Sequence, residues 1–438
     1  MKRSCLFLFA AVGIASGLGV GPGAAQEPTF RRAGVIADRE RREVRVEALA
    51  AGLEKGALAE FILIGPKSGH AYEAVAVSKA APSDVHAALV HAGFQPGRPI
   101  DPAATRFWPR GERVEVTIEW AAAAGDADAP VRRIRAEETI LDRRTGKSLP
   151  PEGFVFVGSM RGTDHEGKDA YLADIEDPMS IISVFNHTAT VFDIPRQGTQ
   201  DELYNHQFVN PEYLWPEKTP LTFVFRPARP DGPSFEMDAR LRFVPGAEGA
   251  PVCELSLNGD PPEIVADAGT LAERIAVRAA GKRDVFALIT FDDRLSLHAL
   301  RAVAATVKRL AEDRTIRIEP PPEGELYFQA FAPNEVFRER ARRPAQPWEL
   351  KLRAADAGGA IAGTLISVLP REGAEPPEFD ETTREVPNAA ALAAALAEER
   401  AGLPVLLVYA PAGLTYAQLR DFVRPALKTH PIVYFFEE

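Results

Sequence analysis

Two segments in the second half of the chain decide the fold: VFALITFDDRLSLHALRAVAATVKR at residues 285–309 and PVLLVYAPAGLTYAQLRDFVRPALK at residues 404–428. They align without a gap at a separation of 119 residues. Upstream of them, TLAERIAVRAAG at 270–281 aligns with ALAAALAEERAG at 391–402, at a separation of 121 residues. The conserved order and almost constant spacing predict one structural unit that occurs twice.

Each copy predicts a helix, a buried strand, a second helix and a second strand. The apolar runs VFALI and VLLVY are typical of central strands, and IRIE and IVYFF are expected to return beside them in parallel through right-handed crossovers. Leu300, Val303 and Val307 lie on one face of the second helix of the first copy. Pro425 is expected to kink or loosen the matching helix of the second copy.

These patterns predict an α+β, multidomain protein. We expect a signal peptide at residues 1–25, a mainly-β domain with one short helix at 26–230, and two repeats at 235–352 and 356–438. Each repeat is predicted to be a small α/β sandwich with two helices on one face of a mixed sheet. Each is also expected to enclose a hydrophobic core of its own.

The N-terminus predicts export from the cytoplasm. Met1, Lys2 and Arg3 are followed by an apolar run and by small residues that favour cleavage after Ala25. A retained membrane anchor is the alternative, although the apolar run is short for a spanning helix. We therefore expect a periplasmic or secreted protein without a later membrane span.

Charge and cysteine content exclude several classes of function. The chain of 438 residues has 51 Lys and Arg against 62 Asp and Glu, a net charge of -11, which disfavours nucleic acid as a partner. Cys5 leaves with the leader, so Cys253 can form no internal disulfide and no iron–sulfur cluster. Because Cys253 alternates with Leu255 and Leu257, we expect a buried strand residue. No cofactor is predicted.

The first region indicates strands with one helix. VRVEAL, FILIG and HAYEAVAVS are strand-like, and the GPKSG turn between the last two predicts a hairpin. Pro82 and Gly93 bound a helical pattern. Val114, Val116, Ile118 and Trp120 alternate with polar residues, which predicts a half-buried strand.

Two resemblances follow from these motifs. GPKSGHAYEAV, APSDVHAALVHAGFQPG, FVFVGS, YLADIEDPMSIISVFN and TVFDIP resemble the YdjY domain over about residues 33–227. That family is sometimes described as ferredoxin-like, but this chain lacks the cysteines for a cluster. The repeats at about 235–438 resemble ExbD/TolR-type periplasmic domains, with ITFDD as the most specific piece. This second resemblance implies an envelope-side binding domain used twice, without the motor function, because no spanning helix adjoins the repeats.

Two groups of residues are candidates for ligand binding. Lys67, His70 and Glu73 flank the first predicted hairpin, where the alternative is an ion pair that stabilises the turn. On a strand, residues 70 and 73 would face opposite ways. The second group is the densest set of carboxylates and amides near the predicted β surface: Asp174, Glu176, Asn186 and Asp193. Such residues more often cap turns.

The sequence favours a non-catalytic binding or adaptor protein of the cell envelope. It contains no nucleophile elbow or dinucleotide fingerprint, and no metal site is predicted. An envelope protein or peptide is a candidate partner, and it would add a strand beside the terminal PIVYFFEE. The alternative is a periplasmic metal-dependent or acid–base hydrolase that uses the carboxylates of the second group.

Overall fold

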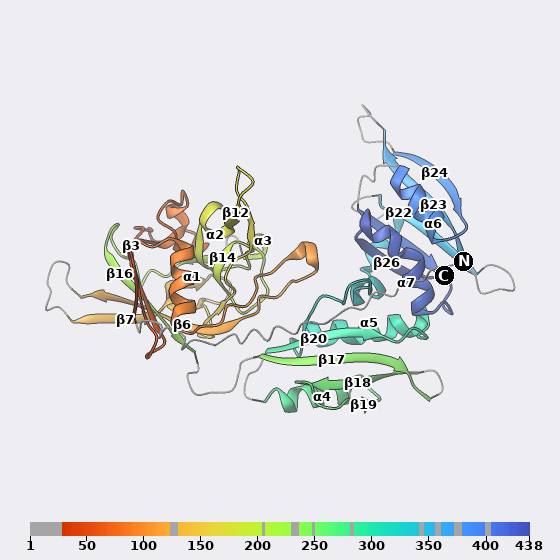
Figure 1. Ribbon diagram of the computed structural model, residues 1–438, viewed down its shortest axis with the longest axis horizontal. Helices are drawn as coiled ribbons and strands as arrows, with labels where there is room; N and C mark the ends of the chain where they lie inside the picture. The colour runs from red at the N-terminus through yellow and green to blue at the C-terminus, as the bar shows by residue number, and fades with distance from the viewer. Residues whose placement is uncertain are drawn as a thin grey trace, which may run out of the picture.

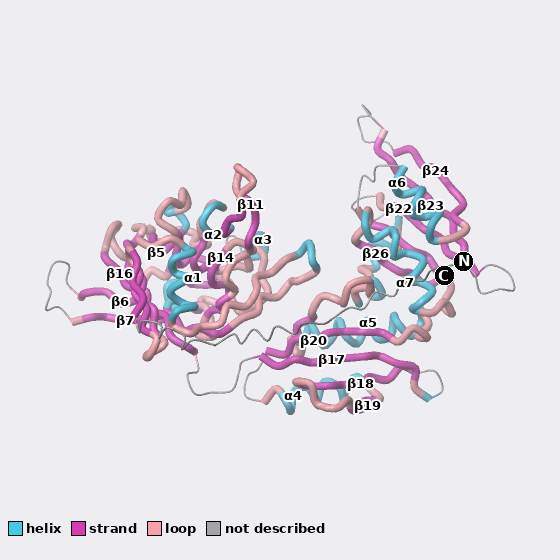
Figure 2. The backbone as a smooth tube through the Cα atoms, in the orientation of Figure 1, coloured by secondary structure: helices cyan, strands magenta, loops and turns pink. Residues whose placement is uncertain are grey.

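The chain folds into three parts, which Figure 1 shows in order from red to blue. The computed structural model describes residues 29–122, 130–203, 206–228, 236–247, 250–280, 284–340, 346–354, 361–371, 379–398 and 404–438. The predicted signal peptide lies outside these residues. We call residues 29–228 the barrel, residues 236–318 the first module and residues 348–437 the second module. Strands predominate in all three, and helices accompany them (Figure 2).

The barrel is a sheet that closes on itself. Its eight closing strands run in the order β3, β16, β6, β10, β14, β13, β4, β5, and pairing of β5 with β3 completes the ring. β1 and β2 extend the sheet beside β3, and β7 pairs with β6. The strands are β1 (Thr29–Arg32), β2 (Val35–Asp38), β3 (Glu43–Ala50), β4 (Phe61–Ile64), β5 (Ala74–Ser78), β6 (Glu112–Ala121), β7 (Val131–Arg135), β10 (Phe154–Phe156), β13 (Ser180–Ser183), β14 (Thr190–Asp193) and β16 (Pro220–Pro227).

One helix longer than a single turn packs on the barrel, as the sequence predicts. α1 (Pro82–His91) begins with proline in its first turn and buries Val85, Ala88 and Leu89. Shorter elements complete this part: the helices α2 (Leu172–Ile175) and α3 (Gln200–Leu203), the hairpin of β11 (Arg161–Thr163) with β12 (Asp169–Tyr171), and a small sheet of β8 (Ile140–Asp142), β9 (Lys147–Ser148) and β15 (Gln207–Val209).

The hairpin predicted around the GPKSG turn is wrong. β4 and β5 pair in parallel, with Phe61 opposite Ala74 and Ile64 opposite Val77. The 3-10 turn η1 (Ala71–Glu73) helps to carry the chain back to the start of β4. A local turn motif does not specify the direction of the next strand, because that direction depends on the neighbours that close the barrel.

The first module is a five-stranded mixed sheet with two helices. Its strand order is β19-β18-β17-β20-β21, antiparallel from β17 to β19 and parallel from β17 to β21. Side chains on one face of these strands join α4 and α5 in a common apolar cluster. The elements are β17 (Glu236–Pro245), β18 (Pro251–Leu257), β19 (Glu263–Val265), α4 (Ala268–Arg278), β20 (Asp284–Phe291), α5 (Leu297–Glu312) and β21 (Arg317–Ile318).

The second module has the same element order and the same topology. Its sheet runs β24-β23-β22-β25-β26, with β22, β25 and β26 parallel to one another. The α-helix ends at Val423, and Pro425 lies in the following 3-10 turn, so the predicted interruption is present. The elements are β22 (Trp348–Ala354), β23 (Ile361–Pro370), β24 (Phe379–Val386), α6 (Ala389–Glu398), β25 (Val405–Ala410), α7 (Tyr416–Val423), η8 (Arg424–Lys428) and β26 (Ile432–Glu437).

The boundary expected between the repeats needs correction. Residues 348–352 were assigned to the first repeat, but β22 pairs with β23 and β25 of the second sheet. The sequence alignment begins at the first helix of each copy, so it contains no information about the strands that precede that helix.

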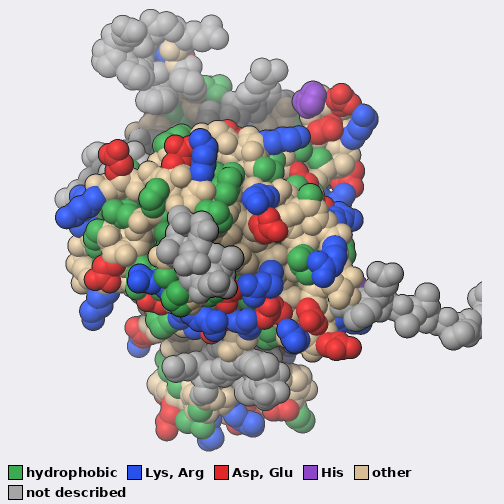
Figure 3. All heavy atoms as spheres, turned by 90° about the vertical axis from the view of Figure 1, so that its left-hand side faces the viewer, with side chains coloured by type: hydrophobic (Ala, Val, Ile, Leu, Met, Phe, Trp, Pro, Cys, Tyr) green, Lys and Arg blue, Asp and Glu red, His purple; other side chains and the backbone are tan. Residues whose placement is uncertain are grey.

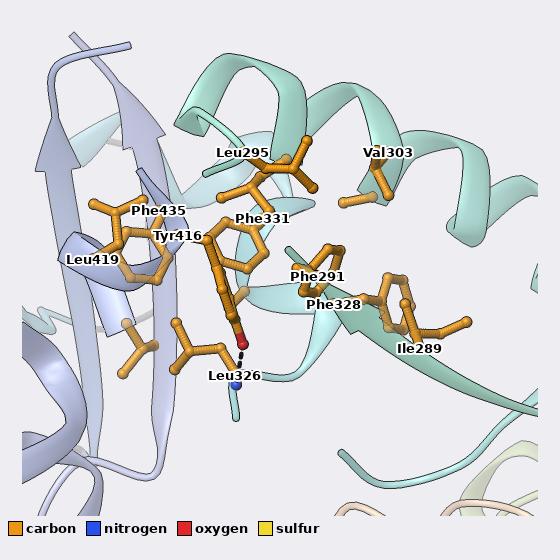
Figure 4. Close-up of a cluster of buried hydrophobic side chains, with 14 of the residues drawn as sticks. Ile289, Phe291, Leu295, Val303, Leu326, Phe328, Phe331, Tyr416, Leu419 and Phe435 are labelled. Atoms are coloured by element: carbon orange, nitrogen blue, oxygen red, sulfur yellow. Dashed lines mark hydrogen bonds between the residues drawn. The ribbon is translucent and has the colours of Figure 1, made fainter. Parts of the chain in front are cut away.

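The two modules share one hydrophobic core. A single cluster of buried side chains runs from Met237 in β17 to Phe435 in β26. Figure 4 shows the junction, where Phe291, Phe331, Tyr416 and Phe435 lie against one another. The expectation of a separate core in each copy is therefore wrong. Aromatic side chains at the ends of the strands and in the connecting segment fill the space between the sheets.

No helix in the described part of the chain is long and apolar enough to cross a membrane.

Candidate functional site

The barrel is attached to the first module by a charged interface. The backbones of Arg98 and Arg110 pair in antiparallel fashion and close the loop of residues 99–109 in the barrel. Arg110 donates from Nε to Glu236 Oε2 at 2.8 Å and from Nη2 to Asp238 Oδ1 at 2.6 Å, and its guanidinium lies 4.6 Å from the centre of the Phe286 ring. Arg98 pairs with Glu319. Charge complementarity across this interface therefore positions the two parts.

Asp284 is the most enclosed anion of this interface. It lies at the start of β20 and accepts from Nη2 of Arg113 on β6, with 2.6 Å between nitrogen and oxygen. Arg317 Nη1, from β21, lies 2.6 Å from the same carboxylate oxygen. The Arg113 side chain is only 6% exposed. Removing Asp284 would leave two largely buried guanidinium groups without their counter-ion.

Arg317 links three elements around the cleft. Its Nη2 donates to the backbone carbonyl of Pro195 at 3.0 Å. Its guanidinium lies 5.0 Å from the centre of the Trp108 ring. Burial lowers the pKa of Arg317, and the negative charge of Asp284 opposes that shift.

A cleft of about 690 Å³ opens beside this cluster. Residues of the barrel and of the first module line it, so a molecule bound there would touch both parts. Five arginines and four carboxylates line the cleft together with a set of apolar residues. The charged residues are Arg113, Arg135, Arg196, Arg314, Arg317, Glu115, Glu152, Asp284 and Glu312, and the apolar ones include Trp108, Pro151, Pro195, Val285 and Ala311.

Arg196 is poorly paired for a half-buried cation, whose side chain is 30% exposed. Its Nε has no hydrogen-bond partner and lies 3.8 Å from Glu152 Oε2, beyond hydrogen-bond distance. Burial lowers the pKa of the Arg196 guanidinium, and repulsion from Arg314 adds to the effect, while Glu152 opposes it. A further anion beside Arg196 would be electrostatically favourable.

The first predicted group of site residues lies around η1, at the end of β4. His70 Nδ1 and Glu73 Oε1 are paired, and His70 Nε2 lies 3.5 Å from Asp177 Oδ2. The expectation that residues 70 and 73 face opposite ways is wrong, because a 3-10 turn places residues three apart on the same side. Lys67 is exposed and has no ion pair among the described residues.

Other side chains stabilise the same loop. Asp177 Oδ1 accepts from Gly69 N and Ser68 Oγ, both at 3.2 Å, which holds the GPKSG turn in addition to the pair of His70 and Glu73. Glu60 is buried close by and accepts from Gln200 Nε2 at 2.6 Å. Burial raises the pKa of Glu60, and the charge of Glu73 adds to that shift. The sequence analysis missed Glu60, which stands before an apolar strand without any motif.

Asp174 and Glu176 of the second group lie in and after α2. Asp174 Oδ1 accepts from Ser83 N at 2.9 Å, so it satisfies a free amide in the first turn of α1. Its negative charge also suits the positive end of that helix. Glu176 is exposed. Asp174 therefore has a structural role in positioning α1.

Asn186 and Asp193 come together in a buried network. Asn186 Nδ2 donates to Asp193 Oδ1 at 3.0 Å, and Asn186 Oδ1 accepts from Gly198 N at 2.8 Å. Asp193 also accepts from the backbone of Ile194 at 2.8 Å. Full burial raises the pKa of Asp193 well above its ordinary value, although these hydrogen bonds act in the opposite direction.

The candidate residues therefore form separate groups. No hydrogen bond or ion pair among the described residues joins Asp174 or Glu176 to the pair Asn186 and Asp193. Within the described ranges, no three His, Cys, Asp or Glu side chains are placed to hold a metal ion. An acid–base pair would require these carboxylates to share a cleft.

The strand expected to receive a peptide is β26, and it does lie at a sheet edge. The segment that connects the modules already lies against it: the Phe331 ring stacks on Phe435 at 5.0 Å, and Arg338 Nη2 donates to the Glu437 carbonyl at 3.3 Å. A peptide added along β26 would compete with these contacts.

The first part of the chain is similar to a known family of domains. Residues 35–214 match the family model of the YdjY domain. The match runs from β2 to the segment before β16, and it agrees with the resemblance seen in the sequence. No curated protein matches the chain. The likeness of the two modules to ExbD and TolR domains stays a prediction.

The cleft lies where the barrel meets the first module, and no motif in the sequence predicts it. Apart from Arg314 and Arg317, which are three residues apart, its arginines at 113, 135 and 196 lie in separate stretches of the chain, and the five form no recognised motif. Only the docking of the two parts brings them together.

Proposed function

We propose that this protein is a non-catalytic binding or adaptor protein of the cell envelope that holds its ligand in the cleft between the YdjY domain and the first module. The observation that carries the proposal is the composition of the cleft wall. Arg113 and Arg196 come from the barrel, whereas Asp284 and Arg314 come from the first module. Pockets between domains are a common place for small-molecule sites.

The candidate acid–base residues support binding over catalysis. Asp193 is fully buried and accepts hydrogen bonds from Asn186 and from the backbone, and Asp174 caps α1. These contacts give both residues structural roles. The hydrolase alternative therefore gains no support from the geometry.

A location outside the cytoplasm is the second part of the proposal, and it rests on the leader at residues 1–25. Cell fractionation tests it. We expect the chain in the fraction released by osmotic shock, shortened by the leader. Recovery of the uncleaved chain with cytosolic proteins would contradict export.

A ligand screen tests the binding function. Purified protein is mixed with single small molecules of a metabolite collection, and the unfolding temperature is measured for each. A molecule that binds only the folded state raises that temperature by mass action. We expect such a ligand to slow exchange of the backbone amides of residues 196, 197, 311, 312, 314 and 317, which line the cleft. Protection only at other residues, or turnover of the ligand, would refute the proposal.

A further inference from the structure

The cleft has an excess of positive charge in an acidic protein. Five arginines face four carboxylates, although the whole chain has a net charge of -11. Most of these carboxylates already have partners. Asp284 pairs with Arg113 and Arg317, and Glu115 pairs with Arg135 at 2.6 Å. Arg196 and Arg314 therefore remain as the cations of the cleft that have no hydrogen-bonded carboxylate among the described residues.

Arg196 has guanidinium N–H donors that are not used in hydrogen bonds to the described residues. No hydrogen bond from its guanidinium occurs within the described ranges, and its Nε is buried without a partner. The nearest carboxylate oxygen, on Glu152, is 3.8 Å away. The lowered pKa of Arg196 agrees with this geometry, since it reflects burial and repulsion from Arg314. A half-buried guanidinium whose Nε lacks a partner favours an incoming oxyanion.

Arg314 is held in place by the end of α5. It follows the last turn of the helix in the left-handed conformation, with φ of 56°. Thr315 N donates to Leu310 O at 2.8 Å, and Arg314 N donates to Ala311 O at 3.0 Å, which closes the helix end. Glycine is the usual residue in this conformation, so an arginine here carries a conformational cost. The helix dipole favours a cation at this end but does not require one in the left-handed position.

The remaining wall of the cleft is apolar. Trp108, Pro151, Pro195, Val285 and Ala311 supply hydrocarbon and an aromatic ring beside the arginines. The Trp108 ring is also fixed by the guanidinium of Arg317. The site thus offers an apolar surface next to unpaired donors, which suits a ligand with one charged end and a hydrophobic body.

We propose that the cleft binds a small molecule whose carboxylate or phosphate group lies between Arg196 and Arg314 and whose apolar body packs against Trp108. This inference rests on the proposed function and adds the chemical class of the ligand. Arginine recognises both groups through paired N–H donors, so the shared chemistry is that of an oxyanion. The volume of about 690 Å³ accommodates an organic molecule larger than the bare anion.

Calorimetric titration at constant ionic strength tests the inference. The probes are phenyl phosphate and benzoate, which separate the two oxyanions, inorganic phosphate, which lacks the apolar body, and benzyl alcohol, which lacks the charge. We expect at least one aromatic anion to bind more tightly than inorganic phosphate, and benzyl alcohol to bind least. Failure of both aromatic anions to bind, or equal binding of benzyl alcohol, would overturn the inference.

Three variants locate the binding. Arg196→Gln and Arg314→Gln should each weaken binding of the better anion by about tenfold or more, because each removes a charge-assisted contact. Arg309→Gln is the matched control, since Arg309 is exposed on α5 and does not line the cleft. It removes the same charge and should leave affinity within about twofold. Equal losses in all three variants would show a general charge effect and overturn the inference.

The proposed function and this inference fail separately. A neutral ligand that protects the amides of residues 196 and 197 from exchange, and binds Arg196→Gln as tightly as the unaltered protein, would overturn the oxyanion while leaving the binding function intact. Protection of these amides by an anion, lost in Arg196→Gln and retained in Arg309→Gln, would support both.

Discussion

Ser296 and Thr415 pair with each other, and they occupy equivalent positions in the two modules, 119 residues apart. Leu297 N donates to Leu414 O at 2.8 Å, and Tyr416 N donates to Leu295 O at 2.8 Å. The same exchange of partners recurs further out, where His298 N donates to Ala412 O and Ala417 N donates to Asp293 O. Equivalent residues thus contact each other reciprocally, as they do across the two-fold axis of a homodimer.

The first prediction concerns the helix caps at this junction. Ser296 Oγ accepts from Ala299 N at 3.2 Å, and Thr415 Oγ1 accepts from Gln418 N at 3.4 Å. Replacing either residue by alanine should lower the free energy of unfolding by about 1 kcal/mol, because a free amide in the first helical turn loses its acceptor. Denaturant unfolding measures the loss. Thr306→Ala, in the middle of α5, is the control and should be neutral or slightly stabilising.

The second prediction concerns the hydroxyl of Tyr416, marked by the dashed line in Figure 4. This buried group accepts from Leu326 N at 3.0 Å and donates to Glu325 Oε2 at 2.5 Å. Tyr416→Phe should lower the free energy of unfolding by about 1–3 kcal/mol, since the buried Leu326 amide is left without a partner. The exposed Tyr72 supplies the control, and Tyr72→Phe should unfold like the unaltered protein. Equal stability of both variants would argue against a structural role for the Tyr416 hydroxyl.

The third prediction concerns the attachment of the barrel to the first module. Asp284→Ala should destabilise the protein by about 3–5 kcal/mol, because Arg113 and Arg317 lose their shared counter-ion in a largely buried setting. Asp238→Ala removes a carboxylate that also pairs across this interface but is 64% exposed, and it should cost about 1 kcal/mol or less. Denaturant unfolding of each variant measures both losses, as the shift of the transition that occurs at the lowest denaturant concentration. Similar shifts would contradict the ranking by burial.

The fourth prediction is a pH dependence that arises from Asp193. Its pKa is raised in the folded protein by burial, so between the unfolded and the folded pKa the native state binds more protons than the unfolded state. Stability should therefore fall as the pH rises above the ordinary pKa of aspartate and through the folded pKa. Asp193→Asn removes this titration. Its stability relative to the unaltered protein should improve with rising pH in denaturant unfolding, and a constant difference would contradict the assignment.

The fifth prediction concerns the lone thiol of β18. Cys253 is 3% exposed, and burial, with a smaller effect of Glu254, raises its pKa to about 12. In a Cys5→Ser chain, an aromatic disulfide reagent at pH 8 should react only after denaturant unfolds the first module, since the thiolate is the reactive form. Rapid reaction of the native protein would show that the sulfur is accessible.

The surface of the barrel illustrates why charge alone is a weak guide to a site. Figure 3 shows basic and acidic side chains interspersed over the face of the barrel turned to the viewer. Ion pairs of the barrel that are exposed on both sides, such as that of Lys79 with Glu47, contribute little to stability. Arg196 differs because it is half-buried and its Nε has no hydrogen-bond partner, and neither property can be inferred from the sequence alone.

The sequence by itself determined the local elements of this protein. From the first helix of each module onward, the repeated pattern predicted the order helix, strand, helix, strand, the parallel return of IRIE and IVYFF, and the interruption at Pro425. It contained no information about the three strands that precede that helix. Hydrophobic periodicity and proline affect the secondary structure of only a few neighbouring residues, so their effects can be predicted from one segment of the sequence. The buried position of Cys253 followed from the same alternation.

Only the tertiary structure decided what lies next to what. The parallel pairing of β4 with β5, the single core of the two modules and the charged cleft all depend on contacts between separate segments of the chain. The contact of His70 with Glu73 depends on the 3-10 turn that the chain makes before β5. Contacts between separate segments depend on the packing of whole sheets. Packing buries the apolar faces and brings charged side chains at the junctions close enough to pair.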